Sequence, residues 1–202
     1  MDWANIITAL GTIILGYFTY NQYTKNKVTD YKLEKWKSED MELNKRRSDN
    51  AMLVYGELWD LLYEIKADRV YIVQPHPLGH EEMLTIYFEV KRRWAKPMKP
   101  AIQRMKISEV AKFSSELVKN LFMYITNIEA QVKDRYAQSI FSSCGTTGVI
   151  VKRLSDQKHD WVGSLICEFT DPMEISEEDA KHKLHTIATN IQYILPEIRE
   201  KI

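Results

Sequence analysis

The sequence contains little cysteine, glycine or proline. Its 202 residues include two cysteines, Cys144 and Cys167, and neither a disulfide framework nor a zinc-binding spacing is present. Glycine and proline number seven and six, and there is no repeat or low-complexity tract. Because 45% of the residues are hydrophobic, this composition fits a folded protein of ordinary size rather than a disordered tail.

The sequence also lacks an excess of either charge. Its 28 Lys and Arg residues balance 28 Asp and Glu residues. No overall field would recruit nucleic acid, so we expect no nucleic-acid partner. The basic and aromatic cluster at Lys91–Lys96 is interpreted as facing solvent or an anionic membrane surface.

One long stretch, Trp3–Tyr20 (WANIITALGTIILGYFTY), has no charge. As a helix it would span about 27 Å, close to the ~30 Å hydrocarbon core of a bilayer. We therefore predict a single-pass transmembrane anchor over residues 1–23, with the lipid bilayer as a partner. A cleaved signal peptide is disfavoured because no positive residue precedes the run and Tyr17–Tyr23 is a poor cleavage site. A buried helix of a soluble domain stays an alternative, since Asn5 and several threonines dilute the hydrophobicity.

Two features of the predicted anchor concern orientation and assembly. Lysines follow the run and none precedes it, so the positive-inside rule places the C-terminal domain in the cytoplasm at the cell membrane. Small residues recur every four positions, which favours close helix packing in lipid and a homo-oligomer. These residues are Ala4, Thr8, Thr12 and Gly16.

Residues 24–49 form a charged connector with eight Lys or Arg and six Asp or Glu. Because no Pro or Gly interrupts it, we predict a helical stalk; a parallel coiled coil is a second interpretation.

Residues 50–202 then alternate between helical and strand-like patterns. Helices are expected at Ala51–Lys66, from Ser108 to Glu129, and after the capping box Ser176–Asp179. Strands are expected at Arg69–Gln74, Leu84–Arg92, Gln138–Ser143, Gly148–Leu154 and Trp161–Phe169, with a turn at Pro75–Gly79.

This order predicts an α+β domain, an antiparallel sheet with flanking helices. Over Asn50–Ile202 it resembles a GAF domain, a small sensor fold related to PAS. The resemblance rests on the helix that runs through Lys66–Val70 into the first strand and on the strand pair Val149–Leu154 and Trp161–Phe169. Within that pair, Val162–Leu165 stands where such domains carry a glycine followed by a hydrophobic residue. The capped final helix after Ile175 completes the likeness.

The resemblance implies a cavity between the sheet and the covering segment Lys106–Glu129. Its expected lining residues are Phe113, Tyr124, Ile140 and Phe141. The cyclic-nucleotide motif of the family is absent, and nothing fixes the Cys or His that tetrapyrrole-binding relatives need, so we expect no cofactor. A cavity filled by side chains, in a domain that acts as an interaction module, is an equal alternative.

No constellation of residues predicts catalysis or a metal site. His76 and His80 flank a turn and are interpreted as polar turn residues, and His182 and His185 are interpreted as part of a solvated helix face. The loop Cys144–Gly148 precedes a strand, whereas a phosphate-binding loop precedes a helix. We therefore expect no enzyme.

Two functional hypotheses follow. The first is a membrane-anchored GAF-like regulatory domain that senses a small molecule or a partner protein and passes its state to an effector protein. The alternative is a membrane-active single-span protein of the phage holin type, in which the soluble domain controls timing.

Overall fold

The structure is a computed structural model that describes residues 3–78 and 81–195. The chain divides into two compact units, Met1–Ser48 and Asp49–Ile202. Helix α1 (Trp3–Glu64) forms all of the described structure of the first unit and extends into the second. The predicted stalk, residues 24–49, is helical along its whole length.

The predicted anchor lies in the first part of α1. Trp3–Tyr20 is helical, but among the described residues no helix is both long enough and apolar enough to cross a bilayer. The described residues therefore do not support the transmembrane prediction.

The predicted helix-packing ridge is not tested. The side chains of Ala4, Thr8 and Thr12 lie outside the described ones, and Gly16 has no neighbouring atom within 4 Å of an added Cβ. Self-association along this ridge stays a prediction, as do the localisation and the orientation of the chain.

The second unit contains a six-stranded sheet in the order β3-β2-β1-β6-β5-β4, in which every neighbouring pair is antiparallel. The strands are β1 (Arg69–Leu78), β2 (Glu81–Lys91), β3 (Met105–Lys106), β4 (Phe122–Ile125), β5 (Gly148–Ser155) and β6 (Trp161–Phe169). The helices are η1 (Ile107–Val110), α2 (Ala111–Lys119), α3 (Ile128–Gln131), α4 (Arg135–Ser143) and α5 (Glu177–Ile191).

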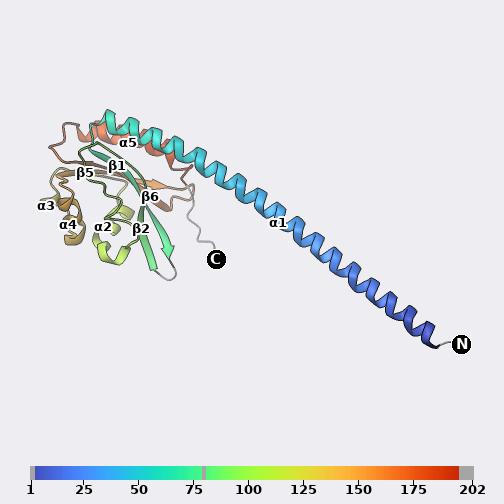
Figure 1. The fold of residues 1–202 in the computed structure, drawn as a ribbon. Coiled ribbons are helices and arrows are strands. Elements are labelled where there is room, and N and C mark those ends of the chain that lie inside the picture. The colour runs from blue at the N-terminus through green and yellow to red at the C-terminus, as the bar shows by residue number, and fades with distance from the viewer. Residues whose placement is uncertain (1–2, 79–80, 196–202) are drawn as a thin grey trace. The chain divides into compact units, whose positions relative to one another are not determined.

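Helices cover both faces of this sheet (Figure 1). On one face, Val54, Leu58 and Leu62 of α1 pack with α5 residues such as Leu184 against the sheet. On the other face, α2, α3, α4 and the segment that leads into β3 bury a second apolar cluster. The α+β class predicted from the sequence is confirmed.

A bulge in β2 divides its side chains between the two cores. Ile72 pairs with Phe88 and Val73 pairs with Ile86, so Tyr87 is the extra residue. Residues two apart in a regular strand face the same way, but here Ile86 joins the second core and Phe88 joins the first.

The region between β2 and β5 differs most from the prediction. The expected helix from Ser108 to Glu129 is wrong: α2 ends at Lys119, Asn120 is extended, and β4 follows. The expected strand at Gln138–Ser143 is also wrong, because it belongs to α4. There Asp134 caps the helix, and Ala137 and Phe141, four residues apart, bury one helical face.

The predicted turn at Pro75–Gly79 is wrong over its first residues, because β1 continues to Leu78. Pairing with β6 ends at Val73, and beyond this point β1 pairs only with β2. Proline lacks a donor N–H but is tolerated on such an open edge, so Pro75 and Pro77 fit the strand.

Candidate functional site

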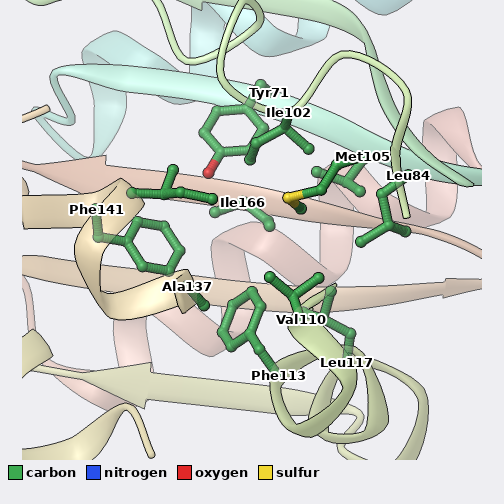
Figure 2. A pocket seen from close by; sticks show the side chains of 12 residues that line it. Tyr71, Leu84, Ile102, Met105, Val110, Phe113, Leu117, Ala137, Phe141 and Ile166 are labelled. Carbon is green, nitrogen blue, oxygen red and sulfur yellow. The ribbon is translucent and has the colours of Figure 1, made fainter. Parts of the chain in front are cut away.

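The candidate site is a cavity on the sheet face that α2 and α4 cover. Its volume is about 20 Å³, and all of its lining is apolar apart from the hydroxyl of Tyr71. Figure 2 shows Phe113 and Leu117 from α2 and Phe141 from α4 pointing toward Ile166 of β6. The rings of Phe113 and Phe141 meet edge to face, with centroids 5.4 Å apart. The remaining lining residues are Val73, Leu84, Ile102, Met105, Val110, Ala137 and Ile140.

A buried ionic network adjoins this cavity through Tyr71. The Tyr71 hydroxyl donates to Oε1 of Glu168 at 2.5 Å. The other carboxylate oxygen, Oε2, accepts from Nε and Nη2 of Arg69 at 3.0 and 2.6 Å and from the hydroxyl of Thr146. The side chains of Arg69 and Glu168 are 0% exposed, so this is an ion pair fully removed from water.

Arg69 has an acceptor for each of its five N–H groups. Besides Glu168, Nη2 donates to the hydroxyl of Thr146 at 2.6 Å, and Nη1 donates to the carbonyl oxygens of Lys96 and Cys144, both at 3.1 Å. A guanidinium can present five donors in fixed directions, and here it ties β1 to β6 and to two loops.

The same burial determines the protonation of the network. Desolvation raises the pKa of the Tyr71 hydroxyl well above its ordinary value, and the nearby Glu168 carboxylate raises it further. Tyr71 therefore keeps its proton and stays a donor. Burial also raises the pKa of Glu168, although Arg69, Thr146 and Tyr71 oppose that rise.

One carboxylate caps both helices that cover the cavity. Oδ2 of Asp134 accepts from the backbone N–H groups of Lys112 and Phe113 at 3.1 and 3.2 Å, in the first turn of α2. Oδ1 accepts from Tyr136 and Ala137 at 3.1 and 3.2 Å, in the first turn of α4. Asp134 thus binds the free N–H groups of two helices at once.

Three of the four predicted lining residues, Phe113, Ile140 and Phe141, lie around the cavity. The fourth, Tyr124, lies on the other sheet face, where it packs against the first core and donates to the carbonyl of Ile175 at 2.6 Å. A ligand contact for any of them stays a prediction.

Solved structures with a similar fold exist, whereas no protein-family model and no curated protein matches the sequence. GAF3 of a Synechocystis protein, in its photoproduct state, superposes with a TM-score of 0.59 at 11% identity over 71% of this chain and 90% of that one. The phycoerythrobilin-bound GAF domain of a cyanobacterial phytochrome gives 0.57 at 14% identity over 76% and 90%. The GAF domain region of a protein from Geobacter sulfurreducens gives 0.57 at 15% identity over 76% and 97%.

The chain has a GAF-like fold. At these identities the likeness concerns the fold alone, and it confirms the fold predicted from the sequence. Whether the GAF-like domain holds a tetrapyrrole is decided by its own cavity.

The cavity of the GAF-like domain does not fit a tetrapyrrole. Sites for drug-sized molecules have volumes of roughly 300–1,000 Å³, whereas this cavity measures about 20 Å³. No Cys or His is among its lining residues. Cys144 packs against the same core but does not line the cavity.

The described part of the chain contains no preformed metal site. No group of three or more His, Cys, Asp or Glu side chains is placed there to hold a metal ion. His76, predicted to be a polar turn residue, instead lies in β1, is buried and pairs with the hydroxyl of Thr85 at 2.7 Å. His182 and His185 are exposed on α5, as predicted; His80 lies outside the described residues.

Sequence reasoning missed Arg69, Glu168 and Asp134. A signal for the first two was present: each is the charged member of an otherwise apolar strand, and a buried charge requires a partner. Asp134 was hidden because the helix that it begins was predicted to be a strand.

A third carboxylate, Asp68, ties the first strand to the segment after β6. Its Oδ2 accepts from the backbone N–H and the hydroxyl of Thr170 at 2.8 and 2.7 Å, and Oδ1 accepts from the indole of Trp94 at 3.0 Å. Burial raises the pKa of Asp68, but the hydrogen bonds from Thr170 and Trp94 outweigh this and hold it below its ordinary value of 3.8.

We expect Asp68→Asn to be less stable than the wild type at pH 7 and the difference to shrink in acid. Because the folded pKa lies below the unfolded one, the stabilisation is present above about pH 4 and is lost as the pH falls through the folded pKa. Chemical unfolding between pH 2 and pH 7 measures this. The exposed Asp171→Asn serves as control; a difference between Asp68→Asn and wild type that stays constant across this range would contradict the prediction.

Proposed function

We propose that this chain is a non-catalytic regulatory protein whose GAF-like domain senses a small apolar molecule in the cavity beneath α2 and α4. The observation that carries this is the apolar lining, in which the single polar group, the Tyr71 hydroxyl, is already bound to Glu168. The similarity to GAF domains supports a sensory or regulatory role. An effector protein would bind the domain and respond to the occupancy of its cavity. The chain itself would act as a homo-oligomer or as a monomer.

The size of the cavity defines the class of ligand. A water molecule needs roughly 10–15 Å³ of such space together with two or more polar partners. The volume of about 20 Å³ is sufficient, but the lining offers no free polar partner. The proposed ligand is therefore apolar. It has very few heavy atoms if it binds in the cavity as it stands, and a larger ligand requires displacement of α2 or α4.

Xenon, an apolar probe of suitable size, tests this proposal on the full chain. We expect xenon pressure to shift the methyl resonances of Leu84, Leu117 and Ile166, which line the cavity, and to leave Leu184 and Ile191 of the other core unchanged. Xenon should also slow amide exchange in α2 and α4, because a ligand at tenfold its Kd adds about 1.4 kcal/mol of stability.

Ala137→Val is the matched variant, since it places additional methyl carbon into the cavity. It should abolish the xenon shifts while α2 and α4 stay folded. Xenon shifts that are absent in the wild type, or equal in both cores, would contradict the proposed sensing site.

The structure offers no specific observation in favour of the membrane-active alternative within the described residues.

A further inference from the structure

Helix α2 has a second face, formed by Ala111, Ser114 and Val118, that does not line the cavity. A groove of about 370 Å³ runs along this face. Its apolar walls include Ile107, Ala111, Val118 and the ring of Trp161. The groove falls in the range of small-molecule sites, roughly 300–1,000 Å³, whereas the cavity does not.

Ser114, one of the residues that line this groove, has a hydroxyl group without a hydrogen-bond partner among the described residues. Ser114 is only 3% exposed, and its hydroxyl oxygen is itself buried. A buried hydroxyl without a partner is costly, and native proteins satisfy the large majority of such groups. A ligand in the groove that bonds to this hydroxyl, once the short Ser114 side chain has rotated toward it, would remove that cost.

The aromatic wall of the groove is held in place. Trp161 is half-buried, and its indole N–H donates to the hydroxyl of Ser164, a fully buried residue of β6, at 3.1 Å. The indole N–H is thereby used inside the protein, and the ring lends its carbon surface to the groove. Aromatic rings pair favourably with one another in stacked or edge-to-face arrangements, so this ring offers a surface for the ring of a ligand.

We propose that this groove binds a small aromatic molecule that carries one hydrogen-bonding group, with the ring on Trp161 and the polar group on the Ser114 hydroxyl. Glu82 and Lys119 at the rim of the groove offer one charge of each sign, so the site favours a ligand without a large net charge. This site is separate from the cavity of the proposed function and does not depend on it.

The groove and the cavity share α2. Ala111, Ser114 and Val118 face the groove, while Phe113 and Leu117 of the same helix point into the cavity (Figure 2). A ligand that orders the outer face of α2 therefore also acts on the helix that covers the cavity.

Phenol and toluene, which differ by a hydroxyl in place of a methyl group, test the proposal on the full chain. Titration followed by the methyl resonances of Ala111 and Val118 gives both dissociation constants at the groove itself. One hydrogen bond of ordinary strength changes an affinity by about two- to tenfold. We expect phenol to bind several-fold more tightly than toluene, and Ser114→Ala to remove this preference by weakening phenol alone.

Ala111→Leu should block the groove for both probes, because Ala111 is an exposed lining residue that can enlarge without disturbing the core. Ala130→Leu, a matched exposed position on α3 outside the groove, should leave both affinities unchanged. Absence of binding to the folded wild type, or the same phenol-to-toluene ratio in wild type and Ser114→Ala, would overturn the proposal.

Discussion

Arg69→Ala is expected to lower the free energy of unfolding by about 3–5 kcal/mol, as the removal of one partner of a buried ion pair does. The variant leaves the Glu168 carboxylate buried without its counterion, and it also frees the carbonyl oxygens of Lys96 and Cys144. Denaturant unfolding of the full chain at pH 7 measures the loss.

The double variant Arg69→Met, Glu168→Leu distinguishes two causes of the stability loss in Arg69→Ala, the unpaired buried charge of Glu168 and the lost packing of the Arg69 side chain. Since it buries no charge, it should be clearly more stable than Arg69→Ala, as buried ion pairs replaced by apolar residues often are. Lys66→Ala removes a pair whose side chains are both 74% exposed, and it should change little because solvent screens that pair. A loss for Arg69→Ala as small as that for Lys66→Ala would contradict our description of the network.

The fold was predictable where the signal is local. Ser176 caps α5 through a 3.1 Å hydrogen bond from the N–H of Asp179, as the capping box predicts. Strand β6, Trp161–Phe169, has the predicted bounds. These elements depend on side chains within a few residues of each other, so a single sequence contains the necessary information.

The errors occur where distant contacts decide the conformation. The apolar spacing through Leu121, Phe122 and Ile125 suits a helix, but pairing with β5 makes Phe122–Ile125 a strand. Tyr124 was therefore assigned to the wrong face: in a strand its neighbours Met123 and Ile125 point to the second core, while Tyr124 points to the first.

The candidate site was predictable in part for the same reason. Phe113, Ile140 and Phe141 line the cavity although two of them were placed in a predicted strand, because their apolar character is independent of the element that carries them. The polar network was not predicted. Arg69 and Glu168 are 99 positions apart in sequence and become neighbours only when β1 pairs with β6.

Asp134→Ala should have the second large effect, a loss of about 2 kcal/mol, because it removes the side-chain acceptor at the N-terminus of two helices and each such cap typically contributes about 1 kcal/mol. The four N–H groups that it satisfies lie in the first turns of α2 and α4, so the loss falls on the cover of the cavity. Hydrogen exchange should therefore increase in α2 and α4 before it increases in α5.

Two further variants identify the cause as double capping. Ser176→Ala removes the cap of one helix on the opposite face, α5, and should cost about 1 kcal/mol.

Asp134→Asn keeps a single acceptor oxygen and turns an amide NH₂ toward the remaining N–H groups, so it should satisfy one helix and not the other. We expect its stability to lie between wild type and Asp134→Ala, with increased exchange confined to either α2 or α4. Equal losses for Asp134→Ala and Ser176→Ala would show that the carboxylate stabilises only one helix, and the two covering helices would then open independently of each other.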